Sequence, residues 1–103
     1  MIQIRDTLQV KFGKIDQAVE LFTGAYQYAP FREPEYHFTV LTDIAGPMYT
    51  LINEFVAPNL GEFETARDQS MNQPGQEEWF RQFQLFIEGG KREYFNVEGA
   101  YTS

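Results

Sequence analysis

The chain has 103 residues, of which 17% are aromatic, and it carries a formal net charge of −7 with no cysteine. Length and aromatic content predict one folded domain over residues 1–103 rather than a disordered segment. The acidic charge argues against nucleic acid and anionic membrane surfaces as partners. The absence of cysteine excludes disulfides and thiolate chemistry. No signal-peptide pattern is present, and no run approaches the roughly 20 apolar residues of a membrane span. We therefore expect a soluble, cytoplasmic protein.

The first third of the chain predicts a strand and then a helix. Apolar residues occupy even positions of the segment 2–12, which is the alternation of a half-buried strand: Ile2, Ile4, Leu8, Val10 and Phe12. The segment 13–30 then has an apolar stripe at helical spacing: Ile15, Ala18, Val19, Phe22 and Tyr26. Prolines at positions 30 and 34 predict a loop at 29–35.

The remainder predicts two strands, a helical region and a last strand. Segments 35–44 and 48–57 are strand-like and are separated by a turn at Gly46-Pro47. A helix is expected from Leu60, and Pro74-Gly75 should interrupt it before a second, strongly aromatic helix. We interpret Gly89-Gly90 as the stop of that helix and 91–100 as the last strand.

This β-α-β-β-α-β order predicts an α+β fold of the ferredoxin-like type. Short connections and right-handed crossovers leave a four-stranded antiparallel sheet, in spatial order 4-1-3-2, with the helices on one face. No repeat, linker or second domain is visible in the sequence.

The sheet face that the helices leave free is expected to be mixed rather than purely polar. If the most apolar side of each strand meets the helices, the free face carries Arg5, Thr7, Gln9, His37, Thr39, Leu41, Asp43, Thr50, Ile52, Glu54, Arg92, Tyr94 and Asn96. Its apolar members suggest that something covers it, and a second copy of the chain is the simplest cover. Because strands 1 and 3 are antiparallel neighbours, we expect an ion pair between Arg5 and Glu54.

Three stretches of the sequence resemble one known group of proteins: "MIQIRDTLQVKFGKIDQAVELF", "VLTDIAGPMYTLINEF" and "EEWFRQFQLFIEGGKREYFNVE". Together they cover nearly the whole chain and are similar to the NIPSNAP-like branch of the dimeric α/β-barrel superfamily. The resemblance implies that two ferredoxin-like subunits pack sheet against sheet into a barrel that holds ligands. Relatives in the superfamily include cofactor-free antibiotic-biosynthesis monooxygenases and haem-degrading monooxygenases.

Haem degradation does not carry over to this sequence. Haem-degrading relatives have an Asn on the first strand, a Trp in the core and a haem-ligating His on a helix. Trp79 is present, but on the apolar stripe of the second helix. Here the first strand has no Asn, and the single histidine, His37, falls on the second predicted strand. We therefore expect no cofactor.

The candidate functional side chains each have a simpler structural interpretation. His37 is the first choice for acid–base chemistry because its ordinary pKa lies near neutrality, but we favour a hydrogen-bonded residue at the sheet rim. The spacing of His37, Asp43 and Glu54 matches no metal motif, so no metal is expected. The aromatic stripe of the last helix is typical of core. A pocket between this helix and the sheet is the alternative, and Arg92, Tyr94 and Asn96 would supply its polar groups.

Three functions follow as alternatives. The first is a homodimeric α/β-barrel protein that binds a small, largely apolar or aromatic molecule. The second is a cofactor-free monooxygenase acting on an aromatic or polyketide-like substrate, for which no secure catalytic residue is visible. The third is a purely structural or interaction dimer. An RNA-recognition module is excluded because its basic aromatic strand motif is absent.

Overall fold

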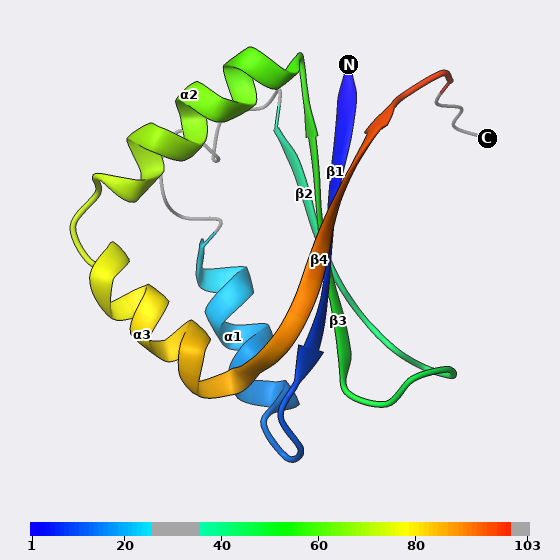
Figure 1. Ribbon diagram of the computed structural model, residues 1–103, viewed down its shortest axis with the longest axis vertical. Coiled ribbons are helices and arrows are strands. Elements are labelled where there is room, and N and C mark those ends of the chain that lie inside the picture. Colours follow the sequence, from blue (N-terminus) through cyan, green and yellow to red (C-terminus); the bar gives the residue numbers. More distant parts are fainter. Residues whose placement is uncertain (26–35, 100–103) are drawn as a thin grey trace.

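The computed structural model describes residues 1–25 and 36–99. Along the chain these residues form β1 (Ile2–Val10), α1 (Ile15–Ala25), β2 (His37–Thr42), β3 (Thr50–Ala57), α2 (Leu60–Met71), α3 (Gln76–Phe86) and β4 (Ile87–Asn96) (Figure 1). The predicted order is confirmed, with the second helical region divided into α2 and α3. Two predicted features, Tyr26 in the first helix and the loop at 29–35, lie outside the described residues.

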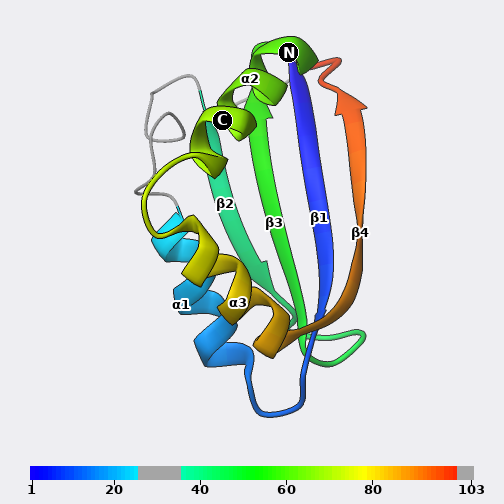
Figure 2. The ribbon, with the colours of Figure 1, turned by 60° about the vertical axis from the view of Figure 1, so that its left-hand side comes forward.

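The four strands form one antiparallel sheet in the order β2-β3-β1-β4, which is the predicted order read from the other edge. All three helices lie on one face of this sheet (Figures 1 and 2). We call that side the covered face; it carries Ile4, Asp6 and Leu8 of β1 and Leu51, Asn53 and Phe55 of β3. The opposite side is the open face, and the described helices leave it bare. None of these helices is long and apolar enough to cross a membrane.

Strand alternation explains which face is covered. In β3, every second residue is buried, from Leu51 to Ala57, and the residues between them are only partly buried. Strand β1 shows the same alternation from Ile4 to Val10. Successive strand residues point to opposite faces, so each strand contributes one row to the core and one to the open face.

The apolar core lies between the covered face and the helices in two clusters. The first cluster contains Ile4, Tyr36, Phe55, Ala57, Phe63 and Ala66 and includes the inner side of α2. The second contains Leu8, Val10, Ala18, Phe22, Leu51 and Ile87, with side chains from α1 and α3 packed against it. The covered face between the two clusters carries polar side chains, and the candidate site is built on them.

Local signals position α2 and α3 above the sheet. The side chain of Asn59 caps α2, because its Oδ1 accepts a hydrogen bond from the backbone N–H of Glu62 at 2.8 Å. Gly75 precedes α3 with a φ of 93°, a conformation that glycine adopts without strain. The indole N–H of Trp79 donates to the carbonyl oxygen of Leu21 at 3.0 Å and so joins α3 to α1.

The interpretation of Gly89-Gly90 as a helix stop is wrong. Helix α3 ends at Phe86, and β4 begins at Ile87 rather than at residue 91, so both glycines belong to the strand. A Cβ on Gly90 would lie 2.6 Å from the carbonyl oxygen of Thr7 and 2.6 Å from Cδ2 of Leu8. Gly90 therefore permits a close approach of β4 to β1, next to the register shift at Gln9/Val10.

Candidate functional site

A cavity of about 660 Å³ lies between α2 and α3 on one side and the covered face of β1, β3 and β4 on the other. Its wall is largely aromatic and includes Phe22, Phe55, Phe63, Trp79, Phe80 and Phe83. A volume of several hundred cubic ångströms with an apolar wall and a few polar groups is typical of small-molecule sites. We call this space the cleft.

The floor of the cleft is a row of three polar side chains that crosses three neighbouring strands. Asp6 of β1 stands opposite Asn53 of β3 and opposite Arg92 of β4 in the sheet register. All three residues line the cleft. Strand pairing therefore brings Asp6 beside two residues that lie 47 (53 − 6) and 86 (92 − 6) positions further along the chain.

Asp6 and Arg92 form a two-point ion pair in this floor. Nε of Arg92 donates to Oδ1 of Asp6 at 2.6 Å, and the second nitrogen donates to Oδ2 at 2.9 Å. The hydrogen bond with Asp6 holds the pKa of the Arg92 guanidinium above its ordinary value, although burial acts in the opposite direction. The guanidinium also lies 5.7 Å from the centre of the Phe63 ring. Paired charges of opposite sign thus balance each other at the floor.

Asn53 differs from this pair because its side-chain amide oxygen has no hydrogen-bond partner within the described part of the chain. Its side chain is 3% exposed, and its Oδ1 has no hydrogen-bond partner among the described residues. A buried polar atom without a partner is destabilising by roughly 1–3 kcal/mol. An amide that also lines a cavity can recover that cost by bonding a molecule inside it.

The helical wall of the cleft also carries polar side chains, namely Arg67 and Ser70 of α2 and Gln76 and Gln84 of α3. Gln76 Nε2 donates to Oγ of the buried Ser70 at 3.3 Å, across the junction of α2 and α3. The Trp79 N–H is already used in its bond to Leu21, so the indole offers the cleft its apolar ring. The cleft therefore combines an aromatic wall with a polar floor.

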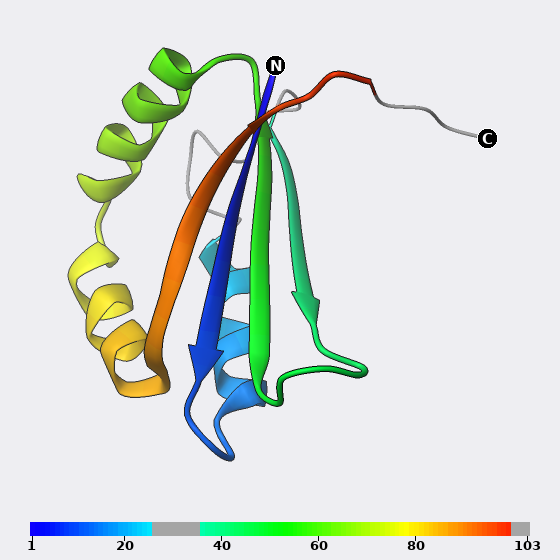
Figure 3. The same ribbon diagram turned by 45° about the vertical axis from the view of Figure 1, so that its right-hand side comes forward.

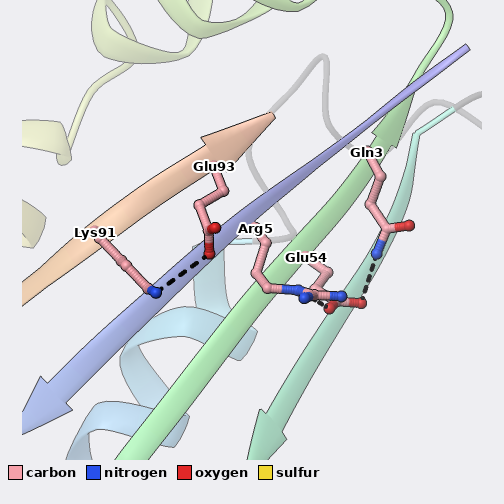
Figure 4. A network of polar contacts seen from close by, with 5 residues as sticks. All are labelled: Gln3, Arg5, Glu54, Lys91 and Glu93. Carbon is pink, nitrogen blue, oxygen red and sulfur yellow. Dashed lines mark hydrogen bonds and ion pairs between the residues drawn. The ribbon is translucent and has the colours of Figure 1, made fainter. Parts of the chain in front are cut away.

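Of the site residues expected from the sequence, only Arg92 lines the cleft. The open face carries Arg5, Thr7, His37 and Glu54, and Asp43 lies just beyond the end of β2. The predicted ion pair is confirmed, because Nε of Arg5 lies 2.7 Å from Oε1 of Glu54. Figure 4 shows this pair on the neighbouring strands β1 and β3, with Gln3 donating to the same carboxylate at 3.0 Å.

The placement of Arg92, Tyr94 and Asn96 on the open face is wrong. Arg92 bonds Asp6 on the covered face, and Tyr94 contacts Phe63 of α2, with ring centres 6.4 Å apart. Asn96 is in the same alternating row, opposite Ile2. The prediction placed the most apolar row of β4 inward, but the inward Asp6 requires a cation, so Phe95 points outward, where the Arg5 guanidinium lies 5.3 Å from its ring centre.

Asp6 and Asn53 are the floor residues that sequence reasoning missed. A signal for them exists: each is a polar residue in the middle of an otherwise apolar inward row. Asp6 interrupts Ile4 and Leu8, and Asn53 interrupts Leu51 and Phe55. Two such interruptions on strands expected to pair indicate a shared polar layer.

His37 gains no support as an acid–base residue. It begins the edge strand β2, is exposed, and does not line the cleft. Within residues 1–25 and 36–99, no group of three or more His, Cys, Asp or Glu side chains is arranged to hold a metal ion.

No protein-family model and no curated protein matches the sequence, but solved structures match the fold. An uncharacterized NIPSNAP domain protein from Burkholderia xenovorans has a TM-score of 0.77 at 10% identity, covering 100% of this chain and 99% of that chain. A NIPSNAP family protein from Agrobacterium tumefaciens has a TM-score of 0.79 at 14% identity, covering 92% of this chain and 90% of that chain. A candidate antibiotic biosynthesis monooxygenase from Deinococcus radiodurans has a TM-score of 0.73 at 17% identity, covering 100% and 98%.

The chain therefore has the ferredoxin-like fold that NIPSNAP domain proteins share with candidate antibiotic biosynthesis monooxygenases, and this confirms, at the level of fold, the resemblance seen in the sequence.

Proposed function

We propose that the cleft binds a small, largely apolar molecule that carries one polar group. The observation that carries this proposal is Asn53, a 3% exposed amide that lines an aromatic cavity and has an Oδ1 without a partner among the described residues. The aromatic wall supports a flat apolar body for the ligand, and Asn53 supports a hydrogen bond at one edge of it.

The ligand's polar group is expected to be uncharged. In the floor of the cleft, Arg92 is already bonded at two points by Asp6, so neither residue offers an uncompensated charge to an incoming anion or cation. The other charged residues that line the cleft are paired or exposed: Arg67 lies 3.7 Å from Asp68, Lys91 lies 3.6 Å from Glu93, and Glu88 is exposed. Bringing a charged group into a cleft without a partner of opposite sign carries a large desolvation cost. A primary amide or hydroxyl avoids this cost and complements the amide of Asn53.

Three matched probes test the proposal: naphthalene-2-carboxamide, 2-naphthoate and naphthalene. Calorimetry measures affinity, and quenching of Trp79 reports occupancy because Trp79 is the single tryptophan and lines the cleft. We expect the carboxamide to bind at least tenfold more tightly than naphthoate. Replacement Asn53→Leu should weaken carboxamide binding about tenfold, the equivalent of one hydrogen bond, and leave naphthalene unchanged.

The same replacement has a second readout that separates binding from folding. Leucine removes the unpartnered buried amide at similar volume, so Asn53→Leu should raise the free energy of unfolding by about 1 kcal/mol. A variant that is more stable but binds the carboxamide more weakly would show that Asn53 contributes to ligand binding rather than to folding. Failure of all three probes to bind at millimolar concentration would defeat the proposal, and a preference for naphthoate would contradict the uncharged polar group.

We also infer that the protein is a homodimer joined through its open face. The charged side chains of that face are paired within one subunit: Arg5 with Glu54 at 2.7 Å, and Lys91 with Glu93 at 3.6 Å (Figure 4). Two copies that each carry −7 repel in general, but this face brings no net charge to the contact. Leu41 and Phe95 are 43% and 41% exposed on it, which supports coverage by a partner.

Oxygen chemistry on the bound molecule is the reaction we propose to test. The fold shared with a candidate antibiotic biosynthesis monooxygenase and the aromatic cleft support it. A phenolic substrate with an activated CH₂ group would itself supply the electrons, so that O₂ converts the CH₂ to a carbonyl and releases water. Oxygen uptake that requires the protein and falls in Asn53→Leu would support an enzyme. Tight binding without oxygen uptake would support a binding protein.

A further inference from the structure

The connection between β2 and β3 forms an arm that consists of residues 43–49. Figures 1 and 3 both show it projecting past the end of the strands on the side opposite the helices. The arm therefore extends on the side of the open face, away from the cleft. It includes the Gly46-Pro47 turn, and the residues at its tip belong to neither apolar cluster of the core.

Two large apolar side chains of the arm lie in solvent. Ile44 is 102% exposed and Met48 is 67% exposed. Single exposed apolar residues are common on protein surfaces and require no explanation. Two of them on one seven-residue projection, reinforced by Phe12 at 82% exposure beside the base of the arm, form a concentrated apolar surface.

The base of the arm is held in one conformation. Oδ1 of Asp43 accepts from the backbone N–H of Thr50 at 3.0 Å, and the Thr50 hydroxyl donates to the carbonyl oxygen of Pro47 at 2.8 Å. Gln9 Nε2 donates to the carbonyl oxygen of Met48 at 2.9 Å. Tyr49 has a φ of 58°, which is strained for a side chain of this size. These bonds hold the base of the arm, from which Ile44 and Met48 project.

We propose that the arm docks onto a second copy of this chain, with Ile44 and Met48 packing against the apolar part of the partner's surface. The inference rests on the proposed homodimer. Direction supports it, because the arm projects on the open side. Charge supports it too, since Asp43 is the arm's only ionisable side chain besides Tyr49 and is bonded at its base. In a two-fold dimer, two such arms reach reciprocally around the contact.

This geometry predicts a contact that sheet packing alone would not supply. Leu41, just before the arm, and Phe95, on β4, are exposed apolar side chains of the open face. Leu41 lies on the edge strand β2 near the arm, and Phe95 lies on the opposite edge strand β4 at the other end of the sheet. A second copy seated on that face therefore offers an exposed apolar side chain at either end of the contact, where an arm can reach it. Because the base of the arm is already held by hydrogen bonds, docking orders fewer residues, and its two apolar side chains should contribute measurably to dimer affinity.

Sedimentation velocity over 1–100 µM, on the full chain, tests the arm with the variant Ile44→Asp (concentrations chosen on the order of typical dimer affinities). The matched control is Leu85→Asp, because Leu85 is 53% exposed but lies on α3, on the helix side. We expect Ile44→Asp to raise the dimer dissociation constant at least tenfold and Leu85→Asp to change it less than twofold. Met48→Ser serves as a second, uncharged variant and should raise the constant severalfold.

The outcomes separate the arm from the dimer itself. A wild-type dimer that Ile44→Asp and Met48→Ser leave unchanged would overturn the arm contact but not the homodimer. An equal effect of Leu85→Asp would assign the loss to added charge and also overturn the arm contact. A wild-type monomer at the highest concentration would overturn both inferences. Unchanged far-ultraviolet circular dichroism confirms that each variant is folded.

Discussion

Two adjacent residues of β1, Arg5 and Asp6, begin ion pairs on opposite faces of the same sheet. Arg5 bonds Glu54 of β3 on the open face at 2.7 Å, and Asp6 bonds Arg92 of β4 on the covered face at 2.6 Å. The distances are nearly equal, yet the surroundings differ. The two arginines are about equally exposed, at 40% for Arg5 and 38% for Arg92, and the carboxylates are 18% and 11% exposed. What differs is the cover, because the Phe63 ring of α2 lies over Arg92, whereas no described helix lies over the Arg5–Glu54 pair.

The difference teaches that the two pairs have different roles. The Asp6–Arg92 pair is bonded at two points and lies in the floor of the cleft, so the folded monomer alone determines its environment. The Arg5–Glu54 pair lies on a face that the described helices leave bare, and its burial depends on a partner. Removing one member of each pair should therefore lower the free energy of unfolding by different amounts.

Asp6→Ala should have the largest effect of these changes. It leaves Arg92 partly buried without its carboxylate, and breaking a buried pair in this way costs about 3–5 kcal/mol. Because the Arg92 side chain is 38% exposed and solvent screens it, we expect a loss below that range, about 2–3 kcal/mol. Urea unfolding measures it.

The double variant Asp6→Ala/Arg92→Met is the control for this prediction. It removes the charge that Asp6→Ala leaves behind, so it should recover at least half of the loss. A double variant as unstable as Asp6→Ala would show that packing, not the unpaired guanidinium, causes the loss.

Gly90→Ala should have the second-largest effect on stability, and Gly89→Ala is its matched control. An added Cβ at Gly90 meets the backbone oxygen of Thr7 at 2.6 Å, whereas the same addition at Gly89 meets nothing within 4 Å. Overpacking of this kind costs roughly 1–3 kcal/mol, while Gly89→Ala should change stability by less than about 0.5 kcal/mol. Thermal unfolding compares the two, and equal effects would contradict the close approach of β4 to β1.

Arg5→Ala should have the smallest effect on the monomer. A partly exposed ion pair contributes about 0.2–1 kcal/mol, so the free energy of unfolding at low protein concentration should fall by no more than that. If a partner covers the open face, the loss should grow with protein concentration, because Glu54 is then buried without its cation. Denaturation at two protein concentrations measures this loss. An unchanged free energy of unfolding at both concentrations would show that the pair contributes neither to stability nor to dimerisation.

Several features were predictable because they depend on local pattern. Alternation of apolar residues identified β1 and β2 as strands, an apolar run identified β3, and the turn at Gly46-Pro47 separated β2 from β3. The Arg5–Glu54 pair followed because both residues lie on the polar rows of strands that the topology places side by side. The Gly89-Gly90 interpretation failed because glycine is favoured both after a helix and where two backbones approach closely.

The sequence by itself determined the element order, the sheet order and one ion pair, because apolar periodicity and chain connectivity leave few alternatives. Only the tertiary structure decided that Asp6, Asn53 and Arg92 meet beneath an aromatic cavity. Their meeting depends on the register of β4 against β1, and a shift of one residue would reverse which side chains of β4 face inward. That register follows from the close contact at Gly90 and from the need of a buried carboxylate for its cation.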